Sequence, residues 1–302
     1  MTVQTGFVKV RRQELNDGSD GMSERRDLPQ EAGYNLRLRH PDFENHFAVW
    51  ESESARIRDS LDCILDVRYG AGPNMTADLF PAPAGDAPIQ VFIHGGYWRA
   101  MDKDVHSFPA EGFVAAGVAV VSLNYALAPA VTLDTIVEQC RTALEWIADN
   151  AGRINGDPDR IFVSGHSAGG HLTAMMLCTD WARRGRPADL AKGGTAISGI
   201  FDLAPIMQTS INDDVRLDAE SAARNSPIHN LPATGAPLIA AVGAAETGAF
   251  VAQNRAFAEA WRARGFEASV MEIDGLHHYT VVMEMGRPGS ALTQAALAQM
   301  GL

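Results

Sequence analysis

The chain has 302 residues, of which 46% are hydrophobic and 21% are charged. This is the composition of a globular protein, and the length is sufficient for a sizeable hydrophobic core. The formal net charge of −12 argues against nucleic acid as a partner, because an acidic surface repels the phosphate backbone. The longest apolar runs have the length of strands and no basic amphipathic stretch occurs, so the sequence predicts no association with a membrane.

The cysteines and the N-terminus indicate the compartment. Cys63, Cys140 and Cys178 are far apart and odd in number, which favours reduced, mostly buried thiols over a disulfide framework and matches no metal site. The N-terminus is polar and lacks the apolar stretch of a secretory signal. These features predict a cytoplasmic protein that needs neither a metal nor another cofactor.

The first part of the chain differs from the rest. Residues 1–30 are polar and show no hydrophobic periodicity, so we expect a flexible N-terminal arm. Residues 31–302 then form a single domain. Its first two strands are predicted in "CILDVRYG" (63–70) and "TADLFPAP" (76–83), as an antiparallel pair at the edge of a sheet.

Strands and helices alternate through the remainder of the domain. Near-continuous apolar runs predict strands buried on both faces within residues 88–96, 118–126, 160–167, 193–202, 237–246 and 268–276. Helices are predicted between them at residues 132–150, 168–183 and 250–264. This alternation predicts an α/β fold whose mostly parallel sheet of about eight strands carries helices on both faces. Residues 204–233, rich in Asp, Asn and Pro, interrupt the rhythm and are expected to form a lid or cap.

The stretch "VSGHSAGGHL" (163–172) places a serine between glycines, after a predicted strand and before a helix. Gly165 and Gly169 lack a Cβ, so the strand and the helix can approach closely around a strained Ser167. Its hydroxyl would then lie at a helix N-terminus, where partial positive charge stabilises an oxyanion. In a parallel sheet, chemistry gathers at such strand ends. The pattern predicts that Ser167 is the nucleophile of an acyl transfer.

A serine nucleophile needs a base, and an imidazole held by a carboxylate supplies one at neutral pH. After the last predicted strand, "DGLHHYTVV" (274–282) offers His277 and His278. We favour His278, because it directly precedes the apolar run of the next helix. The acid is expected after the preceding strand, where Glu246 stands, and Asp202, one strand earlier, is the alternative.

Other histidines are given different roles. His166 directly precedes the serine, and we expect its side chain to face a different side. His171 lies inside the helix after the serine and is expected to pack or to form hydrogen bonds. Four histidines on earlier or intervening loops and helices are expected to be solvated or structural: His40, His46, His106 and His229.

The stretch "VFIHGGYWR" (91–99) ends a predicted central strand with two glycines. Backbone N–H groups of Gly95 and Gly96 can turn toward the serine there, and together with the N–H of Ala168 they are predicted to form an oxyanion hole. Aromatic residues beside the motifs are candidates to line the substrate-binding site: Tyr97, Trp98, Phe201 and Tyr279.

These motifs resemble those of a known family. "HGGYW", "GHSAGGHL", "SGIFDL", "VGAAETGAF" and "HHYTVV" are similar to the kynurenine formamidase (arylformamidase) branch of the α/β-hydrolase fold, which borders on carboxylesterases of the hormone-sensitive-lipase type. The likeness covers about residues 33–286. Carried over by position, it implies Ser167 as nucleophile, His278 as base and Glu246 as acid, where the animal enzymes often have Asp. The oxyanion glycines of the family fall on Gly95 and Gly96.

The resemblance implies hydrolysis of N-formylkynurenine to kynurenine and formate in tryptophan breakdown, through an acyl-serine and without a metal. The alternative is a carboxylesterase for short-chain acyl esters, which would use the same residues. A non-catalytic binding protein on a hydrolase scaffold is less favoured, because such proteins usually lose the serine, the base or the oxyanion glycines. The expected partner is a small formamide or ester with an aromatic group, and homodimerisation is a further expectation.

Overall fold

The computed structural model describes residues 29–302. The predicted N-terminal arm lies outside the described residues except for its last two, which begin helix α2 (Pro29–Tyr34).

A single eight-stranded sheet forms the centre of the molecule, with the strand order β1-β2-β4-β3-β5-β6-β7-β8. Strand β2 runs antiparallel to both of its neighbours, and the other neighbouring strands are parallel. This confirms the predicted mostly parallel sheet with an antiparallel pair at one edge. The strands are β1 (Ile64–Arg68), β2 (Thr76–Phe80), β3 (Ala87–Ile93), β4 (Ala119–Leu123), β5 (Gly156–His166), β6 (Ala191–Ile197), β7 (Leu238–Gly243) and β8 (Ala268–Ile273).

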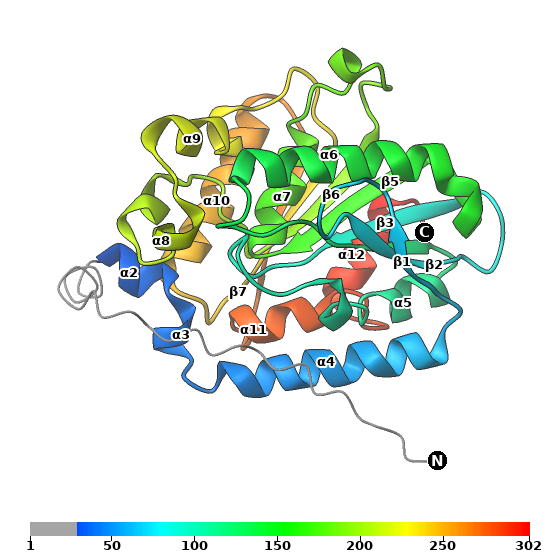
Figure 1. The fold of residues 1–302 in the computed structure, drawn as a ribbon, viewed down its shortest axis with the longest axis horizontal. Helices are drawn as coiled ribbons and strands as arrows, with labels where there is room; N and C mark the ends of the chain where they lie inside the picture. Colours follow the sequence, from blue (N-terminus) through cyan, green and yellow to red (C-terminus); the bar gives the residue numbers. More distant parts are fainter. Residues whose placement is uncertain (1–28) are drawn as a thin grey trace.

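Helices cover both faces of the sheet (Figure 1). Two predicted helices are confirmed as α6 (Leu133–Asn150) and α10 (Gly248–Ala263), whereas α7 (Ala168–Leu177) ends six residues earlier than predicted. The sequence reasoning missed the long helix α4 (Phe43–Ser60), in which only Trp50, Ser54 and Ile57 are buried. The remaining α-helices of residues 29–302 are α3 (Leu36–Arg39), α5 (Ala110–Ala115), α8 (Asn212–Val215), α9 (Ala219–Arg224), α11 (His278–Val281) and α12 (Ala291–Gln299). None of the helices described is both long and apolar enough to cross a lipid bilayer.

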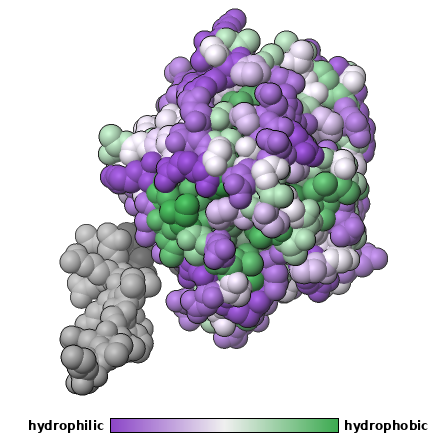
Figure 2. Space-filling model, turned by 90° about the vertical axis from the view of Figure 1, so that its right-hand side faces the viewer, coloured by the Kyte–Doolittle hydropathy of each residue, from purple (hydrophilic) through white to green (hydrophobic). Residues whose placement is uncertain are grey.

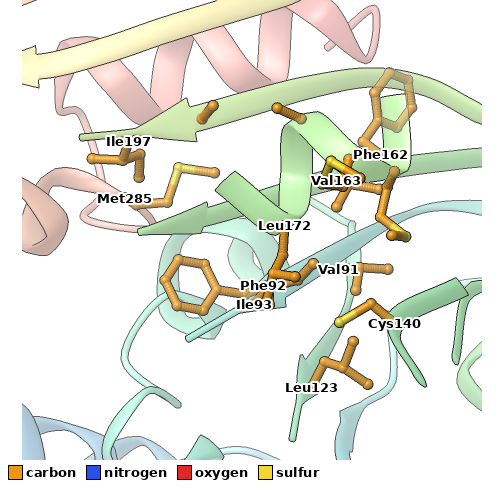
Figure 3. Packing of buried hydrophobic residues seen from close by; sticks show 14 of the residues in the cluster. Val91, Phe92, Ile93, Leu123, Cys140, Phe162, Val163, Leu172, Ile197 and Met285 are labelled. Carbon is orange, nitrogen blue, oxygen red and sulfur yellow. The ribbon is translucent and has the colours of Figure 1, made fainter. Parts of the chain in front are cut away.

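The hydrophobic core lies between the sheet and its helices. Figure 3 shows side chains of β3 beside Leu172 of α7 and Cys140 of α6. The central strand β3 is buried at all seven positions, as expected for a strand covered on both faces. All three cysteines are free, with Cys140 buried and the other two half-buried.

Few large apolar side chains reach the surface. Figure 2 looks onto the side where β1 and β2 lie in Figure 1, and it shows scattered green areas in a mostly purple surface. The large hydrophobic side chains exposed by residues 29–302 are Leu38, Val49, Ile64, Leu65 and Leu302. Most of the large apolar side chains of the described residues are therefore buried in the core.

An ion cluster around the buried pair Lys103–Asp78 fixes the antiparallel edge of the sheet. The ammonium of Lys103, which is 3% exposed, lies 2.9 Å from Oδ1 of Asp78, whose side chain is 1% exposed. It also pairs with Asp66 at 2.8 Å and Asp104 at 2.6 Å. Burial raises the pKa of Asp78, while the N–H of Asp66 and Lys103 act in the opposite direction. The carboxylate of Asp78 therefore depends on Lys103 to remain charged inside the protein.

We predict that Lys103→Met lowers the free energy of unfolding by about 3–5 kcal/mol, because it leaves the buried Asp78 carboxylate without its counter-ion. The measurement is urea-induced unfolding at pH 7. Lys192→Met is the matched control, since the Lys192–Asp189 pair is half-exposed and such pairs contribute less than about 1 kcal/mol. Equal losses in the two variants would contradict the structural role of the cluster.

Candidate active site

Ser167 stands at a sharp turn between β5 and α7, with φ 57° and ψ −117°. A positive φ at a residue other than glycine costs about 1–3 kcal/mol and persists only where the surroundings impose it. Here a Cβ on Gly169 would lie 1.9 Å from the carbonyl oxygen of Ile93, and a Cβ on Gly165 would lie 2.3 Å from that of Gly169. The two glycines are thus required for the close approach of β3, β5 and α7 that holds Ser167 in place.

A buried imidazole–carboxylate pair lies near this turn. Nδ1 of His278 donates to Oε2 of Glu246 at 2.7 Å, and their side chains are 3% and 0% exposed. The other oxygen of Glu246 accepts from the hydroxyl of Ser198 at 2.5 Å and from the N–H of Gly243 at 2.9 Å. The longer glutamate side chain reaches back over the end of β7, and its hydrogen bonds satisfy a carboxylate that would otherwise be costly to bury.

The two alternatives weighed from the sequence lie elsewhere. Nδ1 of His277 accepts from the N–H of Tyr279 at 3.3 Å, so this residue caps helix α11. Oδ1 of Asp202 accepts from the N–H of Ala204 at 3.0 Å and thereby caps a loop.

One cavity, of about 650 Å³ including its opening to solvent, brings the serine and the imidazole together. Both Ser167 and His278 line it. The hydroxyl of Ser167 makes no hydrogen bond to any of residues 29–302, and such bonds commonly tighten only when substrate is bound. The further lining residues are Asn35, Leu36, Arg37, Phe47, Trp50, Gly96, Tyr97, Arg99, Ala100, Met101, His166, Ile211 and Tyr279.

The loop after β3 packs directly against the serine turn. A Cβ on Gly95 would lie 2.8 Å from the carbonyl oxygen of His166 and 3.2 Å from Cβ of Ser167. Gly96 has φ +110°, and a Cβ there would lie 2.1 Å from the carbonyl oxygen of Ala100. Within the described part of the chain, no carbonyl oxygen accepts from the N–H of Gly95, Gly96 or Ala168. These three N–H groups are donors available beside Ser167.

Two of the four predicted aromatic residues line the cavity and two do not. Tyr97 and Tyr279 are part of its wall. Trp98 is fully buried and packs on His171 of α7, and Phe201 is fully buried and stacks on Phe257 of α10 at 4.2 Å. We therefore correct the prediction: Trp98 and Phe201 are core residues, because packing against helices turns their rings away from the cavity.

The orientation expected for His166 is wrong. Its ring lines the same cavity as Ser167, with its centroid 4.5 Å from that of His278 and 5.9 Å from that of Trp50. Successive side chains of a strand alternate between faces, and His166 falls on the face that α4 and α11 cover.

The sequence reasoning also missed one wall of the cavity, which comes from the segment before the sheet. Residues 35–37 and two aromatic residues of α4, Phe47 and Trp50, line it. The indole N–H of Trp50 donates to the carbonyl of Tyr279 at 3.2 Å, which docks α4 on α11. In the sequence, the only indication of this wall was the likeness of "YNLR" (34–37) to the family.

The expected lid, residues 204–233, contributes Ile211 to the cavity wall. Asp214 of the same segment pairs with Arg99, another lining residue, at 2.6 Å.

Residues 29–302 contain no group of three or more His, Cys, Asp or Glu side chains placed to hold a metal ion.

The fold and the site together define the class of protein. The turn that carries Ser167, the pair His278–Glu246 and the mostly parallel sheet are features of α/β hydrolases. Residues 90–282 match the family described as "alpha/beta hydrolase fold", and the chain belongs to this family.

Known proteins show which branch the chain resembles. It is 29% identical to the kynurenine formamidases of Salmo salar, over 265 residues, and of Danio rerio, over 263 residues, with 85% of this chain and 88% of each relative covered. The carboxylesterase NlhH of Mycobacterium tuberculosis is 38% identical over 97 residues, which cover 32% of this chain and 30% of the relative. The resemblance to the kynurenine formamidase branch, close to carboxylesterases, is confirmed.

Solved structures agree on the fold. A crystal structure from Silicibacter sp. TM1040, of a protein described as a candidate thioesterase, is 30% identical with a TM-score of 0.78, and covers 88% of this chain and 98% of that one. The thermostable carboxylesterase EstE1 from a metagenomic library has a TM-score of 0.68 at 22% identity, and the match covers 85% of this chain and 96% of EstE1.

Four histidines around the site are held neutral by burial. Burial lowers the pKa of His94 to about 4, of His106 to about 3 and of His171 to about 4. It also lowers the pKa of His166 well below the ordinary value, and the neighbouring His278 adds to the effect. These groups take up protons in the unfolded chain before they do so in the folded one.

The free energy of unfolding should therefore fall as the pH drops from 6.5 toward 4. Each folded-state pKa lies below the unfolded value, so the stability is complete above pH 6.5 and is lost as the pH falls, by up to about 1.4 kcal/mol per pH unit for each group. Denaturant unfolding at pH 7, 6 and 5 measures this slope. His106→Gln should reduce the slope of the unfolding free energy against pH by the contribution of about one proton. An unchanged slope would show that His106 does not contribute.

Proposed function

We propose that this protein is a serine hydrolase that cleaves an aryl formamide, such as N-formylkynurenine, to the aryl amine and formate. The observation that carries the proposal is the convergence of Ser167 and the His278–Glu246 pair on one cavity. The likeness to the kynurenine formamidases over most of the chain supports the choice of substrate.

The geometry supports a two-step acyl transfer. Oγ of Ser167 attacks the formyl carbon while the free ring nitrogen of His278 accepts the hydroxyl proton, and Glu246 stabilises the imidazolium. The N–H groups of Gly95, Gly96 and Ala168 stabilise the oxyanion, and one such donor contributes about 2.7–4 kcal/mol to the transition state.

The intermediate then collapses, and His278 gives its proton to the leaving amine nitrogen as the C–N bond breaks. Water attacks the resulting formyl ester of Ser167, again with His278 as base. The second tetrahedral intermediate collapses with cleavage of the ester bond. His278 returns the proton to the serine oxygen, and formate is released.

The walls of the cavity support an aromatic leaving group. Phe47, Trp50, Tyr97 and Tyr279 surround the space in front of Ser167, and aromatic rings pack well against such walls. A formyl group needs almost no room on the acyl side, so most of the cavity is available for the amine.

Three further features belong to the proposal. The free state of Cys63, Cys140 and Cys178 supports a cytoplasmic enzyme. The contact between Asp214 and Arg99 at the cavity supports a covering role for residues 204–233. Homodimerisation stays a prediction from the sequence.

The experiment that tests the proposal compares kcat/KM on N-formylkynurenine and on p-nitrophenyl acetate. We expect a clear preference for the formamide. In Ser167→Ala, kcat should fall by more than about a thousandfold, because the variant lacks the nucleophile of the covalent route.

A strong preference for the ester would favour the carboxylesterase, which the likeness to NlhH supports. Ser167→Ala that keeps more than about a hundredth of the wild-type kcat would contradict the serine mechanism. Absence of turnover on both substrates would favour a binding protein.

A matched pair of variants tests the acid. Glu246→Gln should lower kcat by about 10³–10⁴-fold, because an amide no longer stabilises the imidazolium or fixes its tautomer. Asp202→Asn keeps the loop-capping oxygen and should change kcat by less than about threefold, since Asp202 does not contact His278. Steady-state kinetics at pH 7, with circular dichroism to confirm folding, distinguish the two. The reverse order of effects would identify Asp202 as the acid.

A further inference from the structure

The loop after β3 has a backbone conformation that most side chains avoid. The φ angles of Gly96, Tyr97 and Trp98 are +110°, +51° and +57°. Left-handed conformations are unfavourable for bulky L-residues, and two in succession persist only where neighbouring groups hold them. Because the same loop carries the N–H groups beside Ser167, whatever holds it also sets the direction of these donors.

The side chain of Trp98 is anchored on helix α7. Its ring is fully buried and meets the ring of His171 edge to face, with centroids 5.1 Å apart. The indole N–H donates to Nδ1 of His171 at 3.1 Å, and Nε2 of His171 lies 2.7 Å from the carbonyl oxygen of Asn225. An indole can only donate and a carbonyl can only accept. The partners therefore assign the proton of His171 to Nε2 and leave Nδ1 as an acceptor.

His171 is placed to connect three parts of the site without entering it. It lies one turn after the nucleophile, and its backbone N–H donates to the carbonyl of Ser167 at 3.0 Å. It is fully buried and does not line the cavity. Asn225, at the end of α9, is itself 2% exposed and is fixed by the carboxylate of Asp134 at 3.0 Å. The ring of His171 thus has a rigid support on the side opposite Trp98.

We infer that His171 is a positioning residue for the oxyanion hole: by accepting the indole N–H of Trp98 it holds the loop from Gly95 to Trp98 so that its N–H groups face Ser167. The inference rests on the proposed function, because the direction of these N–H groups matters only if Ser167 is the nucleophile. Burial lowers the pKa of His171 to about 4, so the required neutral ring persists at neutral pH.

Two variants break the contact from either side. His171→Phe keeps an aromatic ring but removes the acceptor, and Trp98→Phe keeps a ring but removes the donor. We expect each to lower kcat by about 10–100-fold, less than the full loss of an oxyanion donor, with KM within about threefold of wild type. The double variant should be no worse than the single ones, since the two residues act through one hydrogen bond.

A second readout reports the oxyanion hole itself. Phenylboronic acid forms a tetrahedral adduct on a serine nucleophile and mimics the transition state, so its affinity should fall by about the same factor as kcat/KM. The matched control is Trp181→Phe, which removes a buried indole hydrogen bond to the carbonyl of Met176 at 3.1 Å. Trp181 lies beyond the end of α7, away from the loop, so this variant should lose thermal stability but keep the wild-type kcat and affinity for phenylboronic acid.

The assays use whichever of N-formylkynurenine and p-nitrophenyl acetate the wild type hydrolyses, so a wrong substrate class does not affect this test. Wild-type kcat and phenylboronic acid affinity in folded His171→Phe would overturn the inference. An equal loss of kcat in Trp181→Phe would also overturn it, because the effect would then be one of stability alone. If His171→Phe does not fold, Trp98→Phe decides by the same criteria. A wild type that hydrolyses neither substrate would overturn both proposals.

Discussion

The site depends on one steric constraint, the contact of three backbones around Ser167. Strands β3 and β5 and helix α7 approach so closely that a Cβ at Gly165 or Gly169 would overlap a carbonyl oxygen. This contact forces the positive φ of Ser167, and the hydrogen bond from its N–H to the carbonyl of Ile197, 2.8 Å long, fixes the turn on the sheet. The hydroxyl consequently stands at the amino end of a helix, where the backbone dipoles favour negative charge. The rest of the site is arranged around this fixed oxygen.

Polar groups buried near that oxygen are kept in single states by their partners. Glu246 uses one carboxylate oxygen for Ser198 and Gly243 and the other for His278, so its position does not depend on solvent. His171 is held in one tautomer by the same kind of pairing. In a water-poor interior such fixed donors and acceptors need no reorganisation when charge develops, which is the main source of electrostatic catalysis.

The cavity is closed by elements that are far from the catalytic residues in the sequence. Helix α4 lies on the same side of the sheet as α11 (Figure 1), and Trp50 connects it to α11, which begins with His278. Ile211 reaches the cavity from the connection between β6 and β7, and Asp214 of the same connection forms an ion pair with Arg99. In the proposed mechanism, residues before the sheet and residues after β6 therefore contribute to substrate recognition, whereas the segments after β5, β7 and β8 carry Ser167, Glu246 and His278.

The sequence by itself determined the alternation of the strands with α6, α7 and α10, the candidate nucleophile Ser167 and the candidates for its base and acid, since strand runs and glycine-bounded turns are local patterns. Local patterns do not encode the direction of a side chain at a strand end. Only the tertiary structure decided that His166 faces the cavity and that Trp98 and Phe201 belong to the core. Helix α4 escaped prediction for a related reason, because only three of its residues are buried and so its hydrophobic stripe is weak. The choice between Glu246 and Asp202 as the partner of His278 likewise depended on distances between separate loops, which packing alone sets.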